Sequence, residues 1–274
     1  MTDDRSGQGA PATWDATTYH RVSDPHARWG APIVERLDLR GDETVIDAGC
    51  GTGRVSAQVL ERLPRGRLIA VDRDAAMIQS ARTTLGPVTN GRVRYVRADL
   101  LNLDAAVGEP ADRVFSTATF HWIDDHARLF GALFRSLRPG GWLVAQCGGA
   151  GNIGRLREHV DKIAADPAFA PYLAGWPGPW TFSDADTVAQ HLLAAGFDEI
   201  QTELIDAPVT HPDAETYAEF IRSVVLGEHL LRLPDDAARD CLVAELSARA
   251  SGDTSPYTLD YVRLNIVARR PDTR

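Results

Sequence analysis

The sequence has few cysteines and no long apolar run. Its three cysteines, Cys50, Cys147 and Cys241, lack the paired spacing of a disulfide framework or a metal site. We therefore expect reduced thiols, no metal and a cytoplasmic location. No apolar run approaches the roughly 20 residues that cross a bilayer, so we expect no membrane partner. Residues 1–13 lack the apolar stretch of a signal peptide and are expected to form a disordered tail.

Positive charge is also scarce. The 29 Lys and Arg residues are outnumbered by 38 Asp and Glu residues, which gives a net charge of −9. Because phosphate backbones are bound by Lys and Arg, this balance disfavours nucleic acid as a partner. The content of 44% hydrophobic and 24% charged residues is ordinary for a globular protein. At 274 residues the chain has room for one large α/β domain with a substantial insertion.

A glycine-rich turn stands between a predicted strand and a predicted helix. Asp47 follows a β-branched strand, and Gly49, Gly51 and Gly53 follow Asp47 at alternate positions. Glycine there permits positive φ angles and lets a ligand approach the backbone, next to the positive end of a helix. Arg54 stands where a dinucleotide fingerprint has its third glycine, and the Gly-Lys-Ser/Thr of a phosphate loop is missing. The alternative is a tight turn without a ligand.

Acidic residues end the next two predicted strands. Asp72 follows residues 67–71 and lies about 20 residues beyond the glycines, where a carboxylate can bind both hydroxyls of a ribose. The alternative for Asp72 is a cap for the helix predicted over residues 74–85. Asp99 ends the strand predicted over residues 92–100. Asp47 and Asp72 stand at two adjacent strand ends, and together they favour a bound cofactor more than either does alone.

Strand and helix alternate through five repeats, which predicts a doubly wound parallel sheet of the α/β class. Two further strands are predicted over residues 199–209 and 258–269. The expected organisation is an N-terminal helical lid over residues 14–40, with packing on the core as its alternative, followed by a core over residues 41–149. The remaining segments are a helix and aromatic loop insertion at 150–182, the remainder of the core sheet at 183–210 and 256–270, and a helical cap, or a packed hairpin, at 211–255.

These motifs resemble those of the class I S-adenosylmethionine (SAM) methyltransferases over almost the full chain. The resemblance rests on residues 45–53, 71–72, 98–100, 120–122 and 137–141, the last with the sequence Leu-Arg-Pro-Gly-Gly. It implies a Rossmann-like sheet of seven mostly parallel strands with an antiparallel last strand. It also implies SAM as cofactor, S-adenosylhomocysteine as product, and the following cofactor-binding residues: Asp47, Gly49, Cys50, Gly51, Gly53, Asp72, Arg73, Met77, Asp99, Leu100 and Thr117.

Within this family the chain is most similar to the trans-aconitate-methyltransferase-like branch. The similarity lies in Trp14-Asp15, in Trp122 followed by Asp124-Asp125-His126, and in a helical insertion before residues 263–269. The stretch Leu226-Gly227-Glu228-His229 departs from the Leu-Arg-Pro-Tyr-like stretch of that branch. An acid in place of a cation is ill suited to a tricarboxylate, so we expect a different acceptor.

Methyl transfer is an in-line displacement, and the protein mainly aligns the reacting groups. His121 is the candidate catalytic residue: a general base for a hydroxyl acceptor, or an orienting group for a carboxylate. The alternative is a histidine that only binds its own loop. We expect a monomer or homodimer that methylates a small molecule, with O-methylation of a carboxylate or hydroxyl preferred. Methylation of N or C, or SAM binding without catalysis, are the alternatives. Candidate substrate-binding residues are Tyr19, His20, Trp29, His121, Trp122, Trp176, Arg222 and His229.

Overall fold

The computed structural model describes residues 30, 32–86 and 91–272. The predicted tail, most of the predicted lid and the candidates Tyr19, His20 and Trp29 lie outside these residues. The described end of the lid segment, residues 32–40, packs on the sheet. Its side chains Ile33, Val34 and Leu37 are buried in the core.

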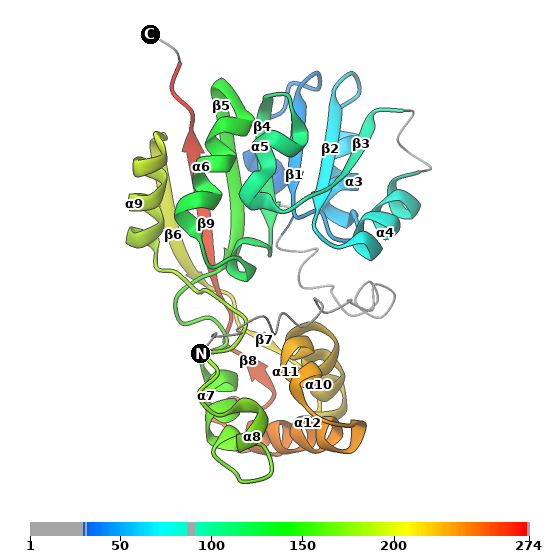
Figure 1. Ribbon diagram of the computed structural model, residues 1–274, viewed down its shortest axis with the longest axis vertical. Helices are drawn as coiled ribbons and strands as arrows, with labels where there is room; N and C mark the ends of the chain where they lie inside the picture. The colour runs from blue at the N-terminus through cyan, green and yellow to red at the C-terminus, as the bar shows by residue number, and fades with distance from the viewer. Residues whose placement is uncertain (1–29, 31, 87–90, 273–274) are drawn as a thin grey trace, which may run out of the picture.

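A seven-stranded sheet forms the centre of the molecule (Figure 1). Strands β1 to β5 are parallel to one another. Strand β9 runs antiparallel to its two neighbours, β5 and β6. This topology confirms the predicted fold class. Across the sheet the order is β3 (Val93–Arg97), β2 (Arg67–Asp72), β1 (Thr44–Ala48), β4 (Ala111–Thr117), β5 (Leu137–Gly148), β9 (Val262–Arg269) and β6 (Asp198–Asp206).

Helices cover both faces of the sheet because its central strands are apolar on both sides. All five residues of β1 are buried. One face packs against α5 (Leu103–Val107), α6 (His126–Ser136) and α9 (Ala185–Ala195). The other packs against α3 (Arg54–Glu61) and the end of α4 (Ala75–Leu85). The chain order reverses between β1 and β4, and in such sheets ligands bind at the carboxyl ends of the strands beside the reversal.

A helical cap lies beyond one end of the sheet (Figure 1). Two separate segments build it around one hydrophobic core, distinct from the cores beside the sheet. The segment after β5 supplies α7 (Gly154–Ala164) and α8 (Ala170–Leu173). The segment between β6 and β9 supplies α10 (Ala214–Phe220), a π-helical turn (Ile221–Val225), α11 (Gly227–Arg232), α12 (Asp236–Ser251) and the short pair β7 (Val209–Thr210) and β8 (Thr258–Leu259).

Two predicted strands are shorter than expected. The strands predicted over 199–209 and 258–269 each break into two where the main sheet gives way to the cap. Pro208 follows β6 and has no amide hydrogen for a ladder. At this point the Ala207 amide donates to the carbonyl of Tyr261, outside the regular pairing. The helix predicted over 212–226 is α10 followed by the π-helical turn.

No helix in the described part of the chain has the length and apolar content needed to cross a membrane.

Candidate functional site

The glycine turn follows β1 and adopts a left-handed backbone at all three glycines. The φ angles are +90° at Gly49, +52° at Gly51 and +82° at Gly53. A Cβ on Gly49 would lie 2.3 Å from Thr119 Oγ1, whereas a Cβ on Gly51 would meet no atom of the described residues within 4 Å. Gly49 is therefore required by packing against the loop after β4. Gly51 has no such constraint and leaves open space beside the backbone.

Asp72 ends β2 beside this turn. Its Oδ2 accepts the amide hydrogen of Gly51 and its Oδ1 that of Asp74, both at 2.9 Å. Burial raises the pKa of Asp72, and these two hydrogen bonds oppose the rise. The cap of α4 is Asp74, whose side chain accepts from the amides of Ala76 and Met77. Asp74, and not Asp72, therefore caps α4. Asp72 instead holds the glycine turn through the Gly51 amide.

Asp47 lies below the turn, buried, and is not among the residues that line the cavity. The Ser56 hydroxyl donates to its Oδ2 at 2.5 Å, and its Oδ1 has no hydrogen-bond partner in the described structure. Burial raises the pKa of Asp47 to about 7, although the Ser56 hydrogen bond lowers it. Because its carboxylate is covered, any influence on a ligand is electrostatic or passes through water.

After β3, Asp99 caps the short 3₁₀ helix Leu100–Asn102. Its carboxylate accepts the amide hydrogen of Leu101 at 2.8 Å. Asp99 remains exposed at the cavity, whereas the side chain of Leu100 is buried in the wall. An apolar side chain beside a carboxylate suits a planar ring that carries an amine.

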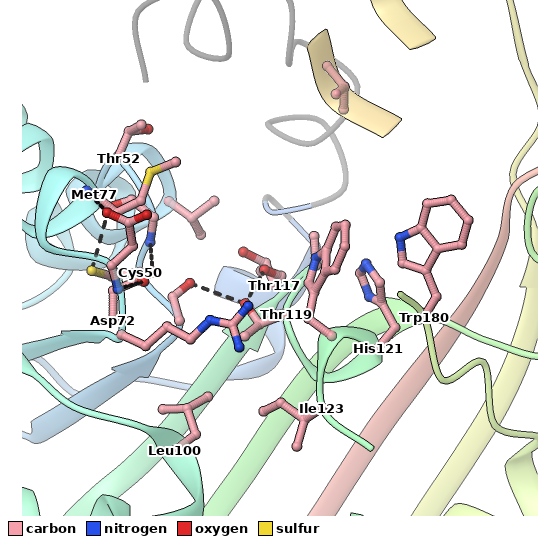
Figure 2. A pocket seen from close by; sticks show the side chains of 18 of the residues that line it. Cys50, Thr52, Asp72, Met77, Leu100, Thr117, Thr119, His121, Ile123 and Trp180 are labelled. Carbon is pink, nitrogen blue, oxygen red and sulfur yellow. Dashed lines mark hydrogen bonds between the residues drawn. The ribbon is translucent and has the colours of Figure 1, made fainter. Parts of the chain in front are cut away.

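These residues line one half of a cavity of about 560 Å³. Figure 2 shows Cys50, Asp72 and Met77 on one side of the view, and His121 and Trp180 on the other. We call the first side the cofactor half; it consists of the lining residues in 49–55, 72–77 and 97–101. The second, the acceptor half, consists of the lining residues in 118–124, 152–153, 180–182, 224–228 and 261–263. Thr117 lies between the halves, at the end of β4. Gly53 is predicted to bind the cofactor but does not line the cavity.

His121 is held in one orientation by its backbone and its ring. It lies in the 3₁₀ turn Phe120–Trp122, and its carbonyl accepts the amide hydrogen of Thr181. Its Nδ1 accepts the amide hydrogen of Gly148 at 3.2 Å. In the neutral imidazole one nitrogen accepts and the other carries the hydrogen. The Gly148 contact therefore selects the tautomer with hydrogen on Nε2.

Aromatic rings surround His121. Its ring centroid lies 5.4 Å from that of Trp122 and 5.7 Å from that of Phe182. Trp180 stacks on Phe182 with 14° between the ring planes and lies 6.0 Å from Trp122. All four side chains line the cavity. The acceptor half therefore has an aromatic wall, defined as Trp122, Trp180 and Phe182.

A row of buried polar side chains crosses β5 and β9. Gln146 pairs with Asn265 across the ladder, and Gly148 pairs with Arg263. The Gln146 amide donates to Asn265 Oδ1 at 2.7 Å, and Arg263 Nε donates to Gln146 Oε1 at 3.4 Å. Arg263 lines the cavity with 3% of its surface exposed. The register thus places a buried cation opposite the glycine whose amide orients His121.

The π-helical turn shapes the cap side of the cavity. The amide of Leu226 donates to the carbonyl of Ile221 at 2.8 Å, a bond that spans five residues. The consecutive residues Val224 and Val225 both line the cavity, and so does Glu228 in the first turn of α11. π-helical turns occur often at functional sites.

Three predicted substrate-binding residues lie elsewhere in the cap. Arg222 pairs with Asp240 at 2.5 Å, and its side chain is 40% exposed. His229 is buried against Trp176 and Trp180, at ring distances of 4.8 and 5.1 Å, and burial lowers its pKa to about 4. Trp176, Arg222 and His229 do not line the cavity. Each has contacts within the cap, and their binding of substrate stays a prediction.

The prediction missed Arg263, Asn152, Glu228 and Tyr261, which line the acceptor half. One signal was present in the sequence: Arg263 and Asn265 are polar residues at alternate positions of an otherwise apolar strand. Residues two apart share a face of a strand, so the pair indicated a polar face.

The cofactor half fits an adenosine that carries an amino acid. The oxygens of Asp72 each accept one backbone hydrogen bond, which leaves lone pairs for the hydroxyls of a ribose. The space beside Gly51 admits a ligand against the backbone. Leu100 and Met77 supply apolar contacts for a ring. These features match SAM, the cofactor expected from the sequence.

Comparison with known proteins agrees with this fit. Residues 45–141 match the model of a methyltransferase domain family. A trans-aconitate 2-methyltransferase of Azoarcus sp. is 38% identical, over 82% of this chain and 84% of that protein. One from Deinococcus radiodurans is 29% identical, over 95% of this chain and 99% of that protein.

A solved structure shares the fold. The phosphoethanolamine N-methyltransferase 2 of Haemonchus contortus, solved with phosphomonomethylethanolamine and S-adenosylhomocysteine, aligns with a TM-score of 0.61 at 19% identity. The alignment covers 94% of this chain and 57% of that one. At this identity the likeness supports the fold, and the family follows from the closer relatives. The chain is a SAM-dependent methyltransferase and belongs to the trans-aconitate-methyltransferase-like branch of the class I family.

Proposed function

We propose that the protein methylates a carboxylate oxygen of a small organic acid. The observation that carries this proposal is the hydrogen bond from the Gly148 amide to Nδ1 of His121. It makes Nε2 the nitrogen of the neutral ring that donates a hydrogen bond. A donor suits an acceptor group that is already an anion. The names of the relatives, trans-aconitate 2-methyltransferases, point to the same class of acceptor.

The same hydrogen bond disfavours His121 as a general base. A base needs a nitrogen lone pair directed at the acceptor hydroxyl, and the lone pair of His121 is directed at Gly148. Turning the ring would leave the buried Gly148 amide without this acceptor, at a cost of about 1–3 kcal/mol. A carboxylate is ionised near pH 7, with an ordinary pKa of about 4. It has no proton to lose, so no base is required.

Arg263 supplies the charge that a carboxylate needs. Its guanidinium is buried at the cavity wall, and Gln146 holds its Nε. Because the ladder pairs Arg263 with Gly148, we infer that Arg263 and His121 bind the same acceptor group. The guanidinium neutralises the carboxylate, and Nε2–H of His121 orients one of its oxygens.

In the cofactor half, Asp72 binds the ribose, Leu100, Met77 and Asp99 enclose the adenine, and residues 49–51 approach the amino-acid part. Arg73 and Cys50 complete this wall. When bound, the cofactor would supply a methyl group on a sulfonium: a carboxylate oxygen would bond to the methyl carbon in line as the carbon–sulfur bond breaks, which gives a methyl ester and a neutral thioether. The protein residues bring the two reacting groups together and exclude water.

The test uses methyl-labelled SAM, the full chain and a panel of organic acids. After the reaction, mild base hydrolyses methyl esters and releases labelled methanol. We expect the label to be released as methanol. Label that stays on the product after base treatment would mean transfer to a hydroxyl, nitrogen or carbon and would contradict the proposal.

Replacement of His121 by glutamine separates orientation from base catalysis. The glutamine amide can donate a hydrogen bond but cannot remove a proton at neutral pH. We expect kcat/KM to fall by no more than about 10-fold, which corresponds to one hydrogen bond, with no change in the shape of the pH profile. Loss of turnover, together with loss of one limb of the pH profile, would instead support His121 as a general base.

A further inference from the structure

We infer that the acceptor is an acid with one carboxylate and an apolar, ring-bearing body, and not a tricarboxylate. This inference rests on the proposed function and concerns the rest of the acceptor molecule. Three observations carry it: the charge of the acceptor half, its aromatic wall and the apolar residues of the π-helical turn.

The described residues of the acceptor half supply positive charge for one carboxylate. Among its described lining residues, Arg263 is the one with a permanent positive charge. Glu228 and Asp124 line the same half and are acidic. A tricarboxylate would bring two further carboxylates beside these acids. Burying a carboxylate without a cationic partner costs several kcal/mol, so such a substrate is poorly matched to this half.

Three aromatic side chains line the same half, together with the polar residues Thr119, Asn152 and Tyr261. Trp122, Trp180 and Phe182 form the aromatic wall, in which Trp180 and Phe182 stack with 14° between their ring planes. Ring faces carry partial negative charge and repel anions. They bind apolar groups and other rings through burial of about 25 cal/mol per Å² of surface. This wall therefore favours a hydrocarbon body over a polar one.

The cap closes the same space with aliphatic side chains. Val224 and Val225 lie on the π-helical turn, and both are buried while lining the cavity. Ile153 adds a third aliphatic group from the segment before α7. These residues come from both segments that build the cap. The two segments together thus enclose the body of the acid, while β9 supplies the group that binds its carboxylate.

The experiment compares three acids as acceptors for the full chain with labelled SAM. The acids are 3-phenylpropanoate, butanoate and trans-aconitate, and the readout is kcat/KM for base-labile product. We expect 3-phenylpropanoate to exceed both others by at least about 10-fold, because it combines one carboxylate with a ring. A higher value for trans-aconitate, or equal values for 3-phenylpropanoate and butanoate, would overturn the inference.

A variant tests the contribution of charge. Glu228→Gln removes one acid from the acceptor half, and Glu215→Gln removes an exposed acid at the start of α10 as a matched control. We expect Glu228→Gln to raise kcat/KM for trans-aconitate several-fold and to leave 3-phenylpropanoate within about 2-fold. Glu215→Gln changes neither. An unchanged ratio in Glu228→Gln would also overturn the inference.

The two proposals fail in different ways. If no acid yields base-labile label although the protein binds SAM, the proposed carboxylate chemistry is wrong. If base-labile label appears and trans-aconitate is preferred, the chemistry stands and the inference about the acid is wrong.

Discussion

The two halves of the cavity are built in different ways. In the cofactor half, each wall comes from a few consecutive residues directly after a strand: the glycine turn after β1, Asp72 after β2, and Asp99 after β3. In the acceptor half, the walls come from the loop after β4, two distant cap segments and β9. Local sequence thus specifies the first half, whereas the second depends on tertiary packing.

The two halves of the cavity also differ in the charged side chains that they bury. The cofactor half places carboxylates at its surface or just below it, and burial raises the pKa of both Asp47 and Asp72. The acceptor half places a buried arginine within a polar row of the sheet. The acceptor half therefore offers a buried positive charge, which agrees with the proposed carboxylate acceptor. In the cofactor half, burial favours the protonated form of both acids, and Arg54, Arg73 and Arg97 also line it.

The largest expected effect concerns Asp47. Its pKa is about 7 in the folded protein, against about 3.8 for the ordinary side chain. Between these values the folded state retains a proton that the unfolded chain loses, so stability falls as pH rises from about 4 to 7. A shift of about three units corresponds to about 4 kcal/mol. Asp47→Asn should remove this loss, so that the variant matches the wild type at pH 4 and exceeds it at pH 8.

Denaturant unfolding of the protein without cofactor, at several pH values, measures this difference. The variant is compared with the wild type at each pH, so that groups far from Asp47 cancel; Asp72 interacts electrostatically with Asp47 and contributes to the difference. If the free energies of unfolding of the two proteins differed by the same amount at every pH, Asp47 would be ionised in the folded state, and its pKa would not be raised.

The next effect separates packing from ligand space within the glycine turn. Gly49→Ala puts a Cβ at a φ of +90° and within 2.3 Å of Thr119, so we expect the free energy of unfolding to fall by about 3 kcal/mol. The added methyl of Gly51→Ala has no neighbour within 4 Å in the described part of the chain, so this variant should lose only about 1 kcal/mol from its left-handed backbone. Calorimetry should nevertheless show weaker SAM binding by Gly51→Ala. If both variants were equally stable, the contact with Thr119 would not be what requires glycine.

Most of the predicted cofactor-binding residues line the cofactor half, because they follow strands at short, regular spacings. Gly49, Asp72 and Leu100 each needed only the position of one strand end. The doubly wound sheet followed from the alternation of strands and helices, and the antiparallel last strand from the family resemblance. Gly53 does not line the cavity and packs closely on Ala81 of α4, a contact between helices that local sequence does not show.

The acceptor half could not be predicted in the same way. Arg263 reaches the cavity through the register of β9 on β5, which pairs it with Gly148. Local sequence does not fix that register. The sequence favoured Arg222 and His229 because they are polar residues on cap helices. Arg222 turns toward Asp240, and His229 packs into the aromatic core of the cap. The prediction named the cap but could not say which of its faces met the cavity.

Arg263 and Arg222 allow a matched test of the acceptor half. Arg263→Met keeps similar volume and removes the buried charge, so we expect the KM for the acid to rise about 100-fold. SAM affinity should stay within about 2-fold, since the cofactor half is unchanged. Arg222→Met removes the cation that the sequence favoured and should alter neither value. Steady-state kinetics with labelled SAM decides between them, and a larger effect in Arg222→Met would relocate the acceptor site.

The smallest effect tests whether Asp72 or its neighbour Asp74 binds the cofactor. Asp72→Asn retains one acceptor oxygen, so one of the Gly51 and Asp74 amides loses its partner and the charge facing the ribose is gone. We expect SAM to bind about 10-fold more weakly in calorimetry. Asp74→Asn should bind normally, because asparagine caps a helix about as well as aspartate. Both carboxylates lie within a few residues of each other, so nonspecific loss of negative charge would weaken binding equally in the two variants. A difference between them would therefore assign the loss to the position of Asp72 beside the glycine turn.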